Sequence, residues 1–375
     1  MKRWIALLLA LVLCLSLGAC GKKVEETPED DTAVEQQDTQ KEDTEDKEKD
    51  KEPKQDEEPN EDEEPVVPVV YRHPLTGEVL NAPWSGSTVA VMINNLRAAM
   101  PQCGISGADV FCELEVESGV TRCLAIYTNL AGVGSIGPVR SARTGFVSMS
   151  TAFEAPLVHC GGSDFALNAQ YSETERLENW QHINEISSDG IYFFRDSQRS
   201  QQGYDYEHTL FTNGEKLSEA LKVKGMDVPK EMTLGWSFQE GVDLKGEKAE
   251  EVVITFKHGK TSTFLYDPTN NVYKMAQHGR DNVDGNTGEV VCFKNVIAIY
   301  VNQKTASNGV HQFYDSIGTG EGYAAINGTI VPILWSRSDV YAPYSFTLGD
   351  GTPLQMDVGT TYLAMVGIQN EISYK

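Results

Sequence analysis

The stretch FCELEVESGVTRCLAIYT (residues 111–128) decides the fold, because it contains two alternating strands joined by a short turn. On the first strand, one face is apolar and the other carries Glu113, Glu115 and Glu117. If Ser118-Gly119 forms a two-residue turn, Glu115 lies opposite Arg122 on the next strand. A three-residue loop would shift the register and place Arg122 on the apolar face. We expect the two-residue turn, because an unpaired buried arginine is costly.

The segments on either side indicate a fold of the α+β class. Strands are expected at 87–95, 108–119, 121–128, 155–160 and 191–196, and helices at 138–153 and from a capping box at Thr212 and Glu215 to about Gly225. After Pro229 the pattern is mostly strands and turns, with strands at 251–256, 262–267, 271–276 and 295–301. This predicts an N-terminal domain with a mixed sheet, residues 69–228, followed by a β-rich C-terminal domain, residues 229–375.

Two arginines follow a Gly-Pro pair in GSIGPVRSARTGF (residues 134–146). With Pro138 at the first helical position, Arg140 and Arg143 lie on one face near the electropositive end of a helix. Three interpretations remain open. The arginines flank an anion-binding notch at the helix start, or they pair with Glu113, Glu115 or Glu117, or they are exposed and contribute little.

Further polar residues lie at predicted strand ends, where ligand sites of mixed sheets tend to gather. The candidates for a ligand-binding site are Arg140, Arg143, Arg195, Arg199, Glu115 and Arg122, and those for an additional polar site are His159, Asp164, Asp196 and His208. No ligand spacing supports a metal site, and no cofactor motif is present. Catalytic residues are not identified, because no nucleophile and base form a recognisable pattern.

The N-terminus indicates export. Residues 1–19 have a basic start, an apolar run and small residues before Cys20, which is typical of a signal peptide. Leu17-Gly18-Ala19-Cys20 also resembles the lipobox of bacterial lipoproteins, in which the cysteine becomes lipidated. Residues 20–68 therefore predict a lipidated Cys20 followed by an acidic, disordered tether. Between Gly21 and Glu64 there are 21 acidic and 7 basic residues, so this segment has net charge −14 out of −24 for the chain.

The folded part has no basic block that would suggest binding to nucleic acid. Its cysteines are odd in number and irregularly spaced, so a disulfide framework is not indicated. These cysteines are Cys103, Cys112, Cys123, Cys160 and Cys292.

Several segments in this order resemble the YerB-like lipoprotein family. They are HPLTG (73–77), AVMINN (90–95), IGPVRSAR (136–143), VHCGGS (158–163), FFRD (193–196), EHTLFT (207–212), YDPTNNVYKM (266–275), FKNVIAIYV (293–301) and the segment at 348–367. The resemblance covers roughly residues 70–373. It implies a surface lipoprotein of mainly Gram-positive bacteria, with an N-terminal α/β sandwich domain and a β-rich C-terminal domain. The family supplies no activity, and this chain lacks the proline expected before His208.

Three functions are compatible with these observations. We favour a non-catalytic, membrane-anchored binding module on the extracytoplasmic face of the membrane, whose arginines recognise an anionic envelope group such as peptidoglycan, teichoic acid or a protein segment. The alternatives are an enzyme that acts on the cell wall through carboxylates such as Glu115 and Glu117, and a structural adaptor that docks envelope proteins through the β-rich domain.

Overall fold

One mixed sheet organises the fold. The computed structural model describes residues 69–167 and 181–375, so the predicted signal peptide (1–19), Cys20 and the tether (20–68) lie outside the described residues. The main path of this 12-stranded sheet is β12-β21-β20-β18-β24-β4-β5-β3-β7-β8. Its strands are β3 (Val89–Asn94), β4 (Val110–Glu115), β5 (Thr121–Tyr127), β7 (Leu157–His159), β8 (His182–Asn184), β12 (Glu247–Lys248), β18 (Asn295–Thr305), β19 (Gln312–Asp315), β20 (Gly318–Ile326), β21 (Thr329–Arg337), β22 (Ser345–Thr347) and β24 (Thr361–Gly367).

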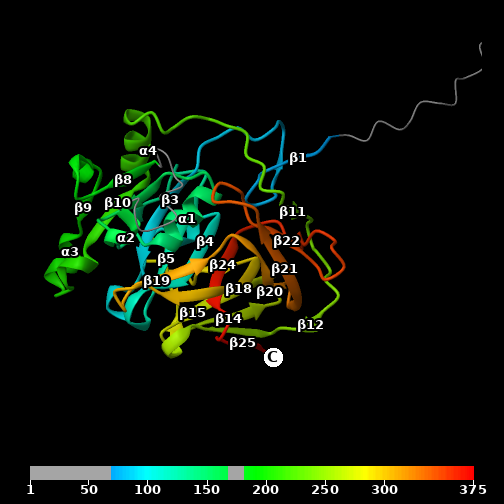
Figure 1. Ribbon diagram of the computed structural model, residues 1–375. Helices are drawn as coiled ribbons and strands as arrows, with labels where there is room; N and C mark the ends of the chain where they lie inside the picture. The colour runs from blue at the N-terminus through cyan, green and yellow to red at the C-terminus, as the bar shows by residue number, and fades with distance from the viewer. Residues whose placement is uncertain (1–68, 168–180) are drawn as a thin grey trace, which may run out of the picture. The chain divides into compact units, whose positions relative to one another are not determined.

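A strand from the end of the chain joins the two halves of this sheet. β24 pairs in parallel with β18 on one side and with β4 on the other, so that Leu363 lies opposite both Ile297 and Cys112 (Figure 1). The two segments that the sequence separates near residue 228 therefore share one sheet. Residues Val67–Lys375 form one compact unit.

A second sheet of six strands follows the path β16-β15-β14-β13-β25, with β17 attached to β15. Its strands are β13 (Glu251–Thr255), β14 (Thr261–Asp267), β15 (Val272–Gln277), β16 (Arg280–Asp281), β17 (Cys292–Phe293) and β25 (Ile372–Tyr374). Three small sheets are made of β1 (Tyr71–Arg72) with β2 (Val79–Leu80), of β6 (Ser135–Ile136), β9 (Phe194–Arg195) and β10 (Leu210–Asn213), and of β11 (Ser237–Phe238) with β23 (Gln355–Met356).

The described α-helices are α1 (Thr144–Ala152), α2 (Asp164–Leu167), α3 (Ser197–Gln201) and α4 (Gly214–Val223). None of the helices in the described ranges is long and apolar enough to span a membrane. The chain is mostly strands with few helices, which confirms the predicted α+β class with a mixed sheet.

The alternation of side chains along the strands produces a hydrophobic core on each face of the large sheet. On one face, Leu114 and Leu363 pack with Phe146 and Met149 of α1. On the other face, Tyr362 packs with Phe264 and Phe293 of the second sheet, in a cluster that also includes residues of α4. The central strands β3, β4, β5, β7 and β24 are buried on both faces, as expected where other layers cover the sheet.

A buried charge connects the two sheets. Glu113 of β4 is completely buried, and its carboxylate forms an ion pair with Lys260. It also accepts hydrogen bonds from Thr121 at 2.6 Å, and from Ser262 and Tyr362 at 2.7 Å. Burial alone would raise the pKa of Glu113, but the charge and the hydrogen bonds of its partners outweigh burial and lower it.

The expected register of the β4–β5 hairpin is wrong. The turn is a three-residue 3-10 helix, η3 (Glu117–Gly119), and Arg122 therefore lies opposite Leu114 while Glu115 lies opposite Thr121. Ser118 and Gly119 both have positive φ, and the backbone closes with a bond from Val116 to Val120. Arg122 is indeed on the apolar face, but it forms an ion pair with Glu117. The cost of an unpaired buried arginine, which argued against this register, therefore does not arise.

The expected helix from Pro138 is wrong in its first turns. α1 begins at Thr144, and the preceding residues are extended because other strands use their backbone groups. Val139 donates to Leu210 and Arg140 donates to Met92. Arg140 and Arg143 therefore do not share a helix face.

The predicted strand at 191–196 and the predicted cap of α4 also differ from the structure. Only Phe194–Arg195 of the expected strand at 191–196 is paired as a strand, and residues 188–192 form a 3-10 helix, η6. The N-cap of α4 is Asn213 rather than Thr212, whose hydroxyl donates instead to the carbonyl of Tyr192. The strands expected at 87–95, 121–128, 251–256, 262–267, 271–276 and 295–301 are confirmed.

Removing only the cation of the buried pair should destabilise the protein strongly. Lys260→Met leaves the Glu113 carboxylate buried without a counter-charge, which costs about 3–5 kcal/mol in the free energy of unfolding. The Glu113→Gln/Lys260→Met double variant should recover a large part of that loss. Urea unfolding of the full chain measures both. Lys248→Met, at an exposed ion pair, is the matched control and should change little. An equal loss in the single and double variants would contradict this account.

Candidate functional site

The segment 137–143 brings the predicted arginines to the ends of several strands. Its backbone bonds to β3 through Met92, and the carbonyl of Arg140 accepts from Cys160, which follows β7. The strands β3, β7 and β8 are parallel neighbours, so their carboxyl ends meet at this edge of the sheet. The arginines are therefore close to a common edge, although each has different partners.

Arg143 and Arg122 share one carboxylate. Arg143 donates from Nε to Glu117 Oε2 at 2.7 Å and from Nη2 to Oε1, while Arg122 donates to Oε1 at 2.8 Å. Burial alone would raise the pKa of Glu117, but the hydrogen bonds from Arg143 and the two positive charges hold it at about 2. Arg122 also donates to the carbonyl of Ser141. Both guanidiniums thus have internal partners. For Arg143 this is the second of the three interpretations, pairing with a carboxylate of the first strand.

Arg140 has a weaker set of partners. Its Nη1 donates to Glu207 Oε2 at 2.9 Å, and the side chain of Glu207 is 47% exposed. Its Nε atom is buried and has no hydrogen-bond partner in the described structure. A guanidinium with an unused donor beside an exposed counter-ion is suited to exchange that counter-ion for another anion.

Arg195 reaches the same region from β9, because its Nη1 donates to the carbonyl of Tyr206, the residue before Glu207. Its guanidinium stacks over the ring of Tyr206, 3.8 Å from the centroid, and lies 3.6 Å from Glu185 Oε1. Cys160 donates its thiol proton to the other oxygen of Glu185 at 3.1 Å. Burial, together with Glu185, raises the pKa of Cys160 to about 12, so the thiol stays protonated. We call the set Arg140, Cys160, Glu185, Arg195, Tyr206 and Glu207 the Arg140–Arg195 cluster.

Arg199 and Asp196 act in local structure. Arg199 is buried and donates to the carbonyls of Ala99, Pro101 and His208. Asp196 caps α3 by accepting from the backbone N–H groups of Gln198 and Arg199. The hydrogen-bond capacity of Arg199 is thus directed to the backbone.

The predicted histidines do not converge. His208 is buried beside Asn94 at 3.0 Å, whereas His159 contacts His182 at 2.9 Å. Burial lowers the pKa of His208 and lowers that of His159 to about 4, so both rings are neutral near pH 7. Asp164 is exposed at the start of α2. Within residues 69–167 and 181–375, no three or more His, Cys, Asp or Glu side chains are grouped as for a metal ion.

Glu115 is a separate buried carboxylate. It is 1% exposed, lies 3.4 Å from His258, and receives a long hydrogen bond from Gln303. Burial raises the pKa of Glu115. Because Glu115 and Glu117 have entirely different partners, they do not form the acid–base pair considered from the sequence.

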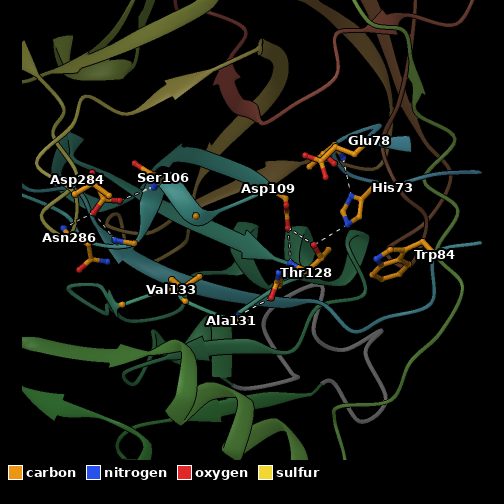
Figure 2. Close-up of a pocket in the computed structure, with 17 residues that line it drawn as sticks. His73, Glu78, Trp84, Ser106, Asp109, Thr128, Ala131, Val133, Asp284 and Asn286 are labelled. Carbon is orange, nitrogen blue, oxygen red and sulfur yellow. Dashed lines mark hydrogen bonds between the residues drawn. The ribbon is translucent and has the colours of Figure 1, made fainter. Parts of the chain in front are cut away.

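The sequence analysis missed a cleft of about 680 Å³ (Figure 2). It is lined by His73, Thr76, Glu78, Trp84, Gly104, Ser106, Gly107, Asp109, Thr128, Asn129, Ala131, Gly132, Val133, Gly134, Asp284, Asn286 and Thr287. The one sequence feature that pointed to this region was the segment HPLTG, whose His73 contacts Thr128 at 3.0 Å. No local pattern links positions that are so far apart in the chain.

The fold defines a two-part protein whose N-terminal α/β part and β-rich C-terminal part share one mixed sheet. Two family profiles match these parts: the N-terminal domain of the protein of unknown function DUF3048 matches residues 75–227, and its C-terminal domain matches residues 252–363. The chain belongs to this YerB-like family, which confirms the resemblance seen in the sequence.

Two comparisons with individual proteins agree with this assignment. The chain is 26% identical over 279 residues to the "Putative lipoprotein YerB" of Bacillus subtilis (strain 168), covering 70% of this chain and 80% of that protein. The crystal structure of the YerB protein from Bacillus subtilis superposes with a TM-score of 0.68 and 25% identity, covering 80% of this chain and 99% of that one.

The shared carboxylate should make stability depend on acid pH. The folded pKa of Glu117, about 2, lies below its value in the unfolded chain, about 4.3. The stabilisation is therefore complete above the unfolded pKa and is lost as pH falls toward the folded pKa. Chemical unfolding of the wild type and of Glu117→Gln should show a difference that is constant near neutral pH and shrinks below about pH 4.3. A difference that does not depend on pH would contradict this.

Proposed function

We propose that this protein is a lipoprotein, held on the extracytoplasmic face of the cell membrane by a lipid on Cys20, whose folded body binds an anionic group of the cell envelope. The signal-like residues 1–19, the lipobox-like Leu17-Gly18-Ala19-Cys20 and the relative described as a lipoprotein support the anchor. The tether expected from the sequence would reach about 150 Å if fully stretched. That reach brings the inner part of a cell wall within range.

The observation that carries the binding proposal is the incomplete pairing of Arg140. A buried guanidinium nitrogen without a partner loses the hydrogen bonds that it would make in water, which is unfavourable until a ligand supplies an acceptor. The counter-ion Glu207 is the most exposed acidic group bound to these arginines, so an incoming anion displaces it with little desolvation. Arg195 then offers a second guanidinium within the same cluster.

The remaining arginines are less available. Arg122 and Arg143 are bound to Glu117 inside the protein, and Arg199 is bound to backbone carbonyls. Displacing Glu117 would expose a carboxylate whose low pKa reflects favourable pairing with both arginines. We therefore assign recognition to Arg140 and Arg195.

The guanidinium groups recognise carboxylate and phosphate through the same planar pair of N–H donors. The candidate ligands are the carboxylates of peptidoglycan stem peptides, the phosphates of teichoic acid and an acidic segment of an envelope protein. The experiment below separates a wall ligand from a protein ligand.

Two substitutions in the Arg140–Arg195 cluster should change wall binding in opposite directions. The full chain, solubilised in detergent, is incubated with purified cell-wall sacculi, and the retained protein and the released wall fragments are measured. Arg140→Ala should weaken retention by about tenfold, since it removes a charged hydrogen-bond donor. Glu207→Gln should strengthen retention, because it removes the competing internal anion.

Arg280→Ala, at an exposed arginine of β16, is the matched control and should leave retention unchanged. Equal retention of all variants would contradict the assignment to Arg140. Release of wall fragments would show an enzyme instead, and absence of any retention would favour an adaptor for envelope proteins.

A further inference from the structure

The cleft in Figure 2 is assembled from parts of the chain that are far apart in sequence. The segment 73–84 forms one wall, the start of β4 and the end of β5 contribute Asp109 and Thr128, and the loop at 284–287 closes the opposite end. Asp284 fastens that end, because it accepts from the backbone N–H groups of Gly104, Ser106 and Asn286 at 2.8–3.1 Å. The cleft therefore has fixed walls on both sides.

The side chains that line the cleft give it a negative charge. Its lining includes the carboxylates of Glu78, Asp109 and Asp284, but no lysine or arginine. His73 does not offset them. Its Nδ1 accepts from the N–H groups of Leu75 and Thr76, and burial lowers its pKa, so the ring is neutral near pH 7. The potential in the cleft consequently favours cations and disfavours anions.

Asp109 is a partly buried carboxylate of the cleft whose charge is incompletely compensated. Its Oδ2 accepts from the N–H and the hydroxyl of Thr128, both at 2.7 Å, whereas Oδ1 has no hydrogen bond from any described residue. No lysine or arginine in the described ranges pairs with it. By contrast, the two oxygens of Asp284 are occupied by backbone donors. A largely buried carboxylate without a cation is unfavourable, and a cationic ligand in the cleft would remove that penalty.

Two groups on the wall formed by segment 73–84 fit a ligand that carries N–H donors. Trp84 is only partly buried and packs edge-on against His73, with 5.7 Å between the ring centroids. An indole next to carboxylates is a favourable surface for an organic cation. Thr76 is 5% exposed, and its Oγ1 has no hydrogen-bond partner among the described residues. That oxygen is an unused acceptor.

We propose that this cleft binds the primary ammonium group of a small polar molecule, with Asp109 as its counter-ion and Trp84 as an aromatic wall. The size of the cleft favours an organic ammonium over a bare metal ion, since about 680 Å³ accommodates a whole small molecule. The described carboxylates are also not grouped as metal ligands. The site is separate from the Arg140–Arg195 cluster and prefers the opposite charge.

A matched pair of probes tests the charge requirement. Nα-acetyl-lysine amide carries a primary ammonium group and no carboxylate, and Nα,Nε-diacetyl-lysine amide is its neutral counterpart of similar shape. Isothermal titration calorimetry with the full chain in detergent should show binding of the first probe and binding at least about tenfold weaker for the second. Asp109→Asn keeps an acceptor for Thr128 but removes the charge, so it should weaken binding of the first probe by about tenfold or more.

Asp243→Asn, at an exposed aspartate outside the cleft, is the control and should bind like the wild type. Trp84→Leu supplies a second variant in case Asp109→Asn does not fold, and should weaken binding several-fold. The proposal is overturned by equal binding of the two probes, by undiminished binding in either cleft variant, or by binding of Ca²⁺ with no binding of Nα-acetyl-lysine amide.

Discussion

The carboxylate of Glu117 is the interaction on which the functional edge of the sheet depends. Without it, Arg122 would be a cation buried on an apolar face, and Arg143 would lie unpaired at the start of α1. The shared carboxylate connects the β4–β5 turn to the end of the segment 137–143. Arg140 of the same segment instead faces Glu207 at the surface.

Complete pairing inside the protein distinguishes its structural charges from those that we propose bind ligands. Lys260 is paired with Glu113, and Arg337, although only 2% exposed, donates to carbonyls and hydroxyls that include those of Ser148. These groups have little left to offer a ligand. Arg140 and Asp109 differ, because each is partly exposed and retains a polar atom that no described residue hydrogen-bonds. We therefore place ligands of opposite charge at these two positions.

The sequence predicted the strands well, because alternating apolar residues are a local signal. It did not predict the β4–β5 register. That register depends on whether the turn has two or three residues, and in the structure Glu117 belongs to the turn and binds Arg143. The start of α1 was missed because the carbonyls of Met92 and Leu210 keep the preceding residues extended, and neither is adjacent in the chain. Gly-Pro is a good local signal for a helix start, but tertiary bonds override it here.

The candidate functional residues were likewise predicted only in part. Arg140 was identified from its predicted place at a helix start and Arg195 from the end of a predicted strand. The structure connects them through Glu207, Tyr206 and Glu185. The cleft was not identified, because Asp109, Trp84 and Asp284 meet only through the tertiary fold. Charge patterns along a sequence do not show which carboxylates are satisfied by backbone N–H groups.

The most direct test of the central claim is to observe the arginine side chains during anion binding. NMR spectra of the full chain with labelled arginines would follow each Nε–H signal while inorganic phosphate is added. Arg143 Nε donates to Glu117, whereas Arg140 Nε has no partner among residues 69–167 and 181–375. The account therefore predicts that the Arg140 signal shifts and the Arg143 signal does not. A shift of Arg143 with no change at Arg140 would contradict it.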